Sequence, residues 1–298
     1  MTSRNIANLV LLAAIWGSSF LLMRVSVPEF GAAPMMFFRV LLAGLALLPF
    51  VFIQKRQGVM LSKAKEMTIV GLFNSALPFS LIAFSTLYVT AGFASVLNAA
   101  TPMCAAVIAF VWLGHRLTML AVLGLLVGFI GVIILVWDKL ELTGQLSESS
   151  LATSLAIAAG LAGAFSYGIA ANYTKQHLAG VDPMVSTVAS QLTAAVILLP
   201  FTVYWWPETI PSFEAWRNVL ILALLCTGFA QILYFRLIES AGAANATTVT
   251  FLIPVFGLLW GGLILDESLE PRTLLACVVI LLGTGLTTGL IRRRKLAS

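Results

Sequence analysis

Apolar stretches of about 20 residues, separated by short polar segments, fill almost the whole chain. A helix of that length crosses the hydrocarbon core of a bilayer, whereas the strands of a membrane barrel would alternate apolar and polar residues. The continuous runs of Leu, Ile and Gly therefore predict an all-α, polytopic membrane protein with ten transmembrane helices. We expect these helices near residues 6–25, 34–54, 67–87, 91–113, 118–137, 152–173, 183–204, 216–238, 242–265 and 270–291.

Composition leads to the same class of protein. Hydrophobic residues occupy 60% of the 298 positions and charged residues only 10%, with a mean hydropathy of +1.02. A soluble domain carries charge on about a quarter of its residues, so this chain could not cover a surface that faces water. The first apolar stretch has one basic residue before it and no small-residue cleavage site after it, which is not the pattern of a signal peptide.

Basic residues are distributed unevenly between the expected loops. With the N-terminus inside, the inner segments hold 12 Lys and Arg residues and the outer ends hold 4. Such an excess is typical of cytoplasmic loops, so we expect both termini in the cytoplasm, including the RRRK segment at 292–295. The net charge of +5 follows from this topology and gives no reason to expect nucleic acid as a partner.

Short motifs recur about half a chain apart. The tetrapeptide LLPF occurs at 47–50 and again at 198–201, an offset of 151 residues. Pro102 in the fourth expected helix and Pro254 in the ninth are 152 residues apart. We therefore predict two five-helix repeats, residues 1–137 and 151–298, joined by a linker loop at 138–150.

Five is an odd number of crossings, so the second repeat must enter the membrane from the opposite side. The loop at 55–65 carries four basic residues, whereas its counterpart at 208–217 carries two Glu and one Arg, as an inverted repeat requires. Inverted repeats are common in secondary transporters, whose sites lie near the midplane beside helices interrupted at matching positions. A proline in a membrane helix is also compatible with a simple packing kink. We predict kinks or gating points at Pro78, Pro102, Gly228 and Pro254.

Five segments carry a family resemblance. They are AAIWGSSFLLMR (13–24), FFRVLLAGLALLPF (37–50), AGFASVLNAATPM (91–103), ESAGAANATTVTFLIPVFGLLWGGLILDESL (239–269) and LLGTGL (281–286). In order and spacing they resemble the EamA repeats of the drug/metabolite transporter (DMT) superfamily, and most of all bacterial exporters of aromatic and other amino acids. The resemblance implies a multi-pass transporter of the bacterial cytoplasmic (inner) membrane. The family often has a glutamate after the fourth helix of a repeat, and here Glu267 has His115 as its first-half counterpart.

Polar side chains inside the expected helices indicate a substrate path, because they are costly in lipid unless they face the bundle interior or a wet cavity. Ser95, Asn98 and Thr101 recur every three residues just before a proline, and an offset of 150 pairs Asn245 and Thr248 with the first two. Interhelical packing is the alternative use of such residues. We predict a substrate-binding cavity formed by Trp16, Ser19, Asn74, Ser75, Phe79, Ser95, Asn98, Thr101, Tyr167, Gln231, Tyr234, Asn245 and Thr248.

Arg39 is the one basic residue well inside an expected helix. It could extend its charged end outward to the membrane surface, or act as a fixed cation that binds a carboxylate or pairs across the bundle. Its counterpart at an offset of 152 is the uncharged Gln191, an asymmetry that favours a structural role over substrate binding.

Several kinds of chemistry are not indicated by the residues. All twelve acidic residues fall in expected loops or helix ends, so no midplane carboxylate is available for a proton or sodium ion. The sequence has no phosphate-binding G-x-x-x-x-G-K-[ST] motif, and its three cysteines have no metal-site spacing. We expect a protein that is not an enzyme and has no cofactor and no bound metal.

These observations predict a secondary transporter that exports aromatic and other neutral amino acids, or related small metabolites, by alternating access through a central cavity. Two alternatives remain: an exporter of drugs or lipophilic cations, and an exchanger of nucleotide sugars or phosphorylated metabolites. The expected partners are a small-molecule substrate and the lipid bilayer. The glycine-rich fifth and tenth helices are expected at the periphery or in a homodimer contact.

Overall fold

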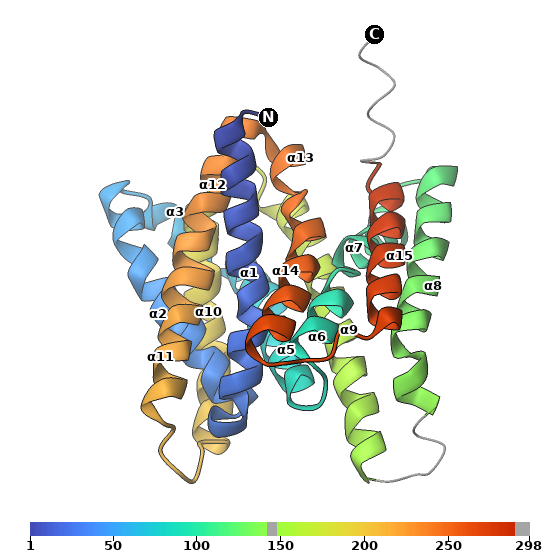
Figure 1. Ribbon diagram of the computed structural model, residues 1–298. Helices are drawn as coiled ribbons and strands as arrows, with labels where there is room; N and C mark the ends of the chain where they lie inside the picture. Colours follow the sequence, from blue (N-terminus) through green and yellow to red (C-terminus); the bar gives the residue numbers. More distant parts are fainter. Residues whose placement is uncertain (142–147, 290–298) are drawn as a thin grey trace.

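The computed structural model describes residues 1–141 and 148–289, which form helices and no strands (Figure 1). Eight helical segments are long and apolar enough to cross a membrane, and two shorter apolar helices, Val249–Ile264 and Pro271–Thr287, complete the set. The predicted all-α, ten-helix class is therefore confirmed. Part of the expected linker at 138–150 is helical, and residues 142–147, like the basic segment at 292–295, lie outside the described ranges.

The first repeat begins with two long helices, α1 (Ser3–Phe30) and α2 (Ala32–Ile53), followed by a short surface helix α3 (Gln57–Ser62). Two interrupted crossings come next, and α8 ends the repeat. They are α4 (Ala64–Gly71), the π-helical turn η1 (Leu72–Ala76) and α5 (Leu77–Tyr88), then α6 (Ala91–Asn98) and α7 (Thr101–Leu113), and finally α8 (Met119–Glu141).

The second repeat has the same order of straight and interrupted crossings. It starts at the end of the molecule opposite to the start of α1, and α15 finishes at the end where α1 starts (Figure 1). Its elements are α9 (Glu148–His177), α10 (Pro183–Tyr204), α11 (Phe213–Ile221), the π-helical turn η2 (Leu222–Phe229), α12 (Ala230–Ala241), α13 (Ala243–Ala246), α14 (Val249–Ile264) and α15 (Pro271–Thr287).

The π-helical turns occupy matching places in the two repeats. Adding 152 to the bounds of η1 gives 224–228, which falls inside η2. In the first repeat Pro78 follows the turn, where its ring and missing N–H disturb the regular hydrogen-bond ladder. In the second repeat, Gly228 lies in the turn and the Thr227 hydroxyl donates to the Leu222 carbonyl at 2.9 Å. Proline and an inserted hydroxyl are recognised causes of such bulges.

The helix breaks in the fourth and ninth crossings do not match as closely. The first break lies at residues 99–100, and Pro102 then starts α7. The second lies at 247–248, four residues before the position that an offset of 152 would give, and Pro254 lies inside α14. The two prolines therefore occupy different places in their helices, and the repeats differ by about one helical turn here.

Helices α8 and α15 pack with their backbones almost in contact. A Cβ on Gly124 would lie 2.5 Å from the Thr287 nitrogen and 2.7 Å from the Gly283 carbonyl oxygen. Small residues allow this close approach between membrane helices. The glycine-rich faces expected at the periphery or in a homodimer are thus occupied within one chain, and the outward faces of both helices carry exposed Leu, Ile, Phe and Val residues.

Candidate functional site

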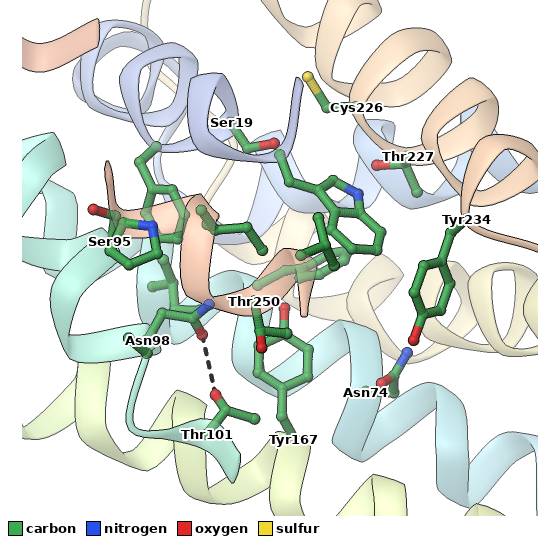
Figure 2. A pocket seen from close by; sticks show the side chains of 18 of the residues that line it. Ser19, Asn74, Ser95, Asn98, Thr101, Tyr167, Cys226, Thr227, Tyr234 and Thr250 are labelled. Atoms are coloured by element: carbon green, nitrogen blue, oxygen red, sulfur yellow. Dashed lines mark hydrogen bonds between the residues drawn. The ribbon is translucent and has the colours of Figure 1, made fainter. Parts of the chain in front are cut away.

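A cavity of about 370 Å³ lies between the two repeats. Its 24 lining residues come from α1, α2, η1, α5, α6 and α7 of the first repeat and from α9, α10, η2, α12 and α14 of the second. Figure 2 shows polar side chains converging on it from several of these helices. The break after α6 brings this part of the chain to the cavity, where Thr101 donates a hydrogen bond of 3.4 Å to the Asn98 side chain (Figure 2).

Ten of the thirteen residues predicted to bind substrate lie together around this cavity, and two of the four predicted kink positions, Pro102 and Pro254, also line it. The ten residues are Trp16, Ser19, Asn74, Phe79, Ser95, Asn98, Thr101, Tyr167, Gln231 and Tyr234.

The other three predicted residues lie elsewhere. Ser75 is fully buried and does not line the cavity, whereas its neighbour Asn74 in the same π-helical turn does. Asn245 is exposed, and its amide donates to the Ala241 carbonyl at 2.8 Å. The Thr248 hydroxyl donates to the Asn245 carbonyl at 2.6 Å. Asn245 and Thr248 thus satisfy local backbone groups at the break before α14.

Thr250 and Thr227 also line the cavity, although neither is among the thirteen residues predicted to bind substrate. The offset of 152 that relates the two prolines pairs Thr250 with Asn98, and the offset of 150 used for this helix was wrong. The correct signal was therefore present in the sequence. Thr227 also had a signal in the sequence, because it shares one helical face with Gln231 and Tyr234 at i, i+4 and i+7, and all three line the cavity.

Most residues of the cavity wall form pairs, one residue from each repeat, whose members lie 152 positions apart in the sequence. Eight pairs at this offset supply 16 of the 24 lining residues. The two residues of most pairs differ in chemistry. The repeats therefore contribute matching positions to the wall but place different polar groups on its two sides. The pairs are Ser19 with Ala171, Arg39 with Gln191, Asn74 with Cys226, Phe79 with Gln231, Ile82 with Tyr234, Asn98 with Thr250, Thr101 with Ile253 and Pro102 with Pro254.

Aromatic rings and unpaired polar atoms share the wall. Trp16 and Tyr234 have ring centroids 5.3 Å apart, and those of Phe79 and Tyr167 are 6.3 Å apart. Ser19 Oγ is buried without a hydrogen-bond partner among the described residues, as is Oε1 of Gln191. Buried polar atoms normally have partners, so these two atoms are available to a bound molecule.

Arg39 is the only charged residue that lines the cavity, a statement that covers the described parts of the chain. Its side chain is 5% exposed and does not extend to the membrane surface. Its Nε donates to Thr227 Oγ1 at 3.0 Å, and its guanidinium carbon lies 4.0 Å from the centroid of the Phe79 ring. Nη1 contacts the sulfur atoms of Met23 and Met36 at 3.7 and 3.9 Å.

Polar contacts join the repeats at both ends of α1: Asn5 and Ser240 exchange hydrogen bonds of 3.4 and 3.1 Å near its start, and a second group lies where it finishes. The Glu267 carboxylate accepts hydrogen bonds from the backbone N–H groups of Ala91 at 2.8 Å and Gly92 at 3.2 Å, at the start of α6. An anion at a helix N-terminus is stabilised by the helix dipole. Asn218 donates to the Ser26 hydroxyl at 3.1 Å nearby. These contacts join the loop after α14 to α6, and α11 to α1, at the end where α1 finishes.

Comparison with known proteins gives one family and several relatives. The model of the EamA-like transporter family matches residues 4–137 and again 154–289. The uncharacterized transporter YoaV of Bacillus subtilis is 24% identical, and the match covers 97% of this chain and 98% of the relative. For the uncharacterized inner membrane transporter YedA of Escherichia coli the identity is 26%, covering 92% of this chain and 87% of the relative.

A solved crystal structure has the same fold. It matches with a TM-score of 0.65 at 17% sequence identity, over 98% of this chain and 100% of the other. The arrangement of helices around the cavity is therefore one that an experimentally determined structure also adopts.

Proposed function

Because the chain belongs to the EamA-like transporter family, it is a multi-pass membrane transporter, and we propose that it exports neutral amino acids, aromatic ones included, or related small metabolites. In this proposal the substrate crosses by alternating access through the cavity between the repeats. The membrane is the bacterial inner membrane, with both termini in the cytoplasm.

The observation that carries the proposal is the chemistry of the cavity wall. Its volume of about 370 Å³ lies at the small end of the range for ligand pockets. The ring pairs around Trp16 and Phe79 can contact an apolar or aromatic side chain. Asn98, Gln231 and the unpaired Ser19 hydroxyl can orient the polar end of the same molecule. A neutral amino acid combines these two kinds of surface.

The charge of the cavity argues against the two alternative substrate classes. A lipophilic cation would meet the positive charge of Arg39, and no carboxylate among the described lining residues offsets it. A phosphorylated metabolite would bring more negative charge than one guanidinium can neutralise, and such groups are typically held by several basic residues. A molecule with no net charge or a single negative charge fits better.

The contacts around Glu267 suggest from which side this conformation takes up substrate. In the proposal they keep closed the end of the cavity where α1 finishes, which is the extracytoplasmic end if the N-terminus is cytoplasmic. The described conformation is then the one that loads substrate from the cytoplasm. Inverted repeats can exchange their conformations to expose the same site on the other side, and substrate release would follow that exchange.

Counterflow tests this function. Purified protein in liposomes preloaded with unlabelled phenylalanine, methionine or threonine is assayed for uptake of the same labelled amino acid, with equal pH on both sides. We expect accumulation above that of protein-free liposomes, and we expect Asn98→Ala and Gln231→Ala to reduce it at least about tenfold, the effect of losing polar contacts to a charged group.

A matched control is Asn245→Ala, because Asn245 has the same side chain as Asn98 but lies outside the cavity. This variant should keep its uptake. Absence of counterflow with every amino acid tested, from protein that is folded and correctly inserted, would contradict amino-acid transport.

A further inference from the structure

Arg39 is a buried cation without a counter-ion. It lies in α2 on the wall of the cavity, and no carboxylate of the described residues forms an ion pair with it. Burying a charge away from water is costly unless it is paired. A structural arginine in lipid usually pairs with an acid or reaches the surface, and Arg39 does neither. A missing anion is the simplest completion of this site.

The guanidinium is held in place but only partly used. A guanidinium has five N–H donors. Nε bonds the Thr227 hydroxyl, and the Phe79 ring covers one face. Nη1 has only the two weak sulfur contacts, and Nη2 has no hydrogen bond to any described residue. The group is therefore fixed in orientation while its terminal donors, on a residue that lines the cavity, remain available to a ligand.

We propose that Arg39 binds the carboxylate of the substrate, and that this carboxylate, rather than an amino group, is the part that every substrate must carry. The inference rests on the proposed transport function and narrows its substrates to small monocarboxylates, with amino acids as one subset. A guanidinium matches a carboxylate in shape and can donate two parallel hydrogen bonds to it.

The cavity supplies no matching anion for an ammonium group. Its described lining contains no Asp or Glu. Ser19 Oγ and Gln191 Oε1 are unpaired and can accept a hydrogen bond from an amino or a hydroxyl group equally well. Binding therefore requires the negatively charged carboxylate of the substrate and does not require its positively charged ammonium group. Acids without an amino group should also bind.

Competition among compounds with one phenyl ring and similar length tests this rule on the unaltered protein. Counterflow of labelled phenylalanine is measured with added 3-phenylpropionate, which lacks the amino group, or phenethylamine, which lacks the carboxylate. We expect 3-phenylpropionate to compete within a few-fold of phenylalanine, and phenethylamine to be weaker by at least about tenfold, the loss expected for a charge-assisted bond. Equal competition by the two compounds would overturn the inference.

Arg39→Met removes the charge and keeps an apolar side chain. We expect ligand-free protein to unfold at the same or a higher temperature, because an unpaired buried charge is gone. The thermal stabilisation by 3-phenylpropionate should disappear, and the preference for carboxylate over amine should be lost. A merely structural Arg39 would instead lower the unfolding temperature and leave that preference intact, which would overturn the inference.

Two further variants make the result independent of folding defects. Gln191→Met introduces the same side chain at the repeat-related position, and it should retain the carboxylate preference even where overall uptake falls. Arg39→Lys keeps the positive charge but lacks the planar guanidinium with its paired N–H donors. This variant should retain the preference for carboxylate over amine, with weaker binding.

The outcomes separate this inference from the proposed function. Phenylalanine transport that is unchanged in Arg39→Met would leave amino-acid export standing and remove the role of Arg39. Binding of 3-phenylpropionate that depends on Arg39, in a protein that carries no amino acid, would support the carboxylate site and contradict amino-acid export.

Discussion

At the scale of single residues, Thr227 connects the bend of its helix to the charge in the cavity. Its hydroxyl accepts from Arg39 Nε at 3.0 Å and donates to the Leu222 carbonyl at 2.9 Å, across the π-helical turn. One side chain thus helps to shape η2 and to orient the guanidinium. A hydroxyl is required for both contacts, and Thr227 as a whole is only 3% exposed.

Thr227→Val tests this double role, because valine has nearly the same shape without the hydroxyl. We expect a loss of about 1–3 kcal/mol in the free energy of unfolding, since a buried N–H donor loses its acceptor. Substrate affinity should fall as well, because the guanidinium is no longer held. Thermal unfolding and saturation uptake measure the two effects, and Thr227→Ser, which keeps the hydroxyl, should restore both. A valine variant that matches the unaltered protein in both assays would contradict this account.

At the scale of helices, α8 and α15 pack backbone against backbone. Gly124 faces backbone atoms of Gly283 and Thr287, which cannot move aside as the end of a flexible side chain could. Gly128 differs, because a side chain there would meet the flexible Met103. The two glycines on one helix should therefore differ in their tolerance of substitution.

Gly124→Val should lower the free energy of unfolding by about 1–3 kcal/mol, the usual cost of overpacking. Gly128→Ala should cost less, because Met103 can rearrange. Gly58→Ala is the control, since a Cβ at that position meets nothing within 4 Å. Unfolding followed by temperature in detergent gives the comparison. A Gly124→Val protein as stable as the control would show that these helices do not pack as described.

The helical elements could be predicted from the sequence more fully than the site. Long apolar runs determine crossings through length alone, so all ten appeared in the predicted places. The position of the break before α14 could not be predicted this way. It lies one turn earlier than its counterpart, and Asn245 and Thr248, which an offset of 150 had paired with cavity residues, lie at this break. The offset of 152 instead pairs Thr250 with Asn98, and both residues line the cavity.

The environment of Arg39 was also beyond sequence reasoning. Its charge was visible, but the sequence does not show that Thr227, 188 residues away, supplies its hydrogen bond, or that Phe79 covers its face. The uncharged Gln191 at the paired position favoured a structural role. The structure places both residues on the cavity wall, where an asymmetric pair can bind an asymmetric ligand.

At the scale of the whole molecule, the Glu267 contact joins the loop after α14 of one repeat to the start of α6 of the other. Glu267→Gln keeps the shape and removes the negative charge that the start of α6 favours. We expect this end of the cavity to open more often. A cysteine at Ser95, which is fully buried next to the cavity, should then react faster with a membrane-impermeant maleimide added from the side where α1 finishes.

The labelling experiment uses protein in which Cys104, Cys226 and Cys277 have been replaced, so that Ser95→Cys carries the only thiol. Asp266→Asn is the control, because it removes a neighbouring charge that makes no contact with α6 among those described. A labelling rate unaffected by Glu267→Gln would show that this carboxylate does not hold the end closed.

The unequal partners at positions 115 and 267 have a consequence for the transport cycle. If the repeats exchange conformations, an offset of 152 brings His115, not a carboxylate, to the start of α13. An imidazole has no negative charge, so it stabilises a helix N-terminus less than a carboxylate does. The empty carrier should then rest mostly in the described conformation, and its return after unloading should be energetically downhill. The conformational change of the substrate-loaded carrier should then be the slow step. It depends on how much more tightly the exchanged conformation binds the substrate than the described one does.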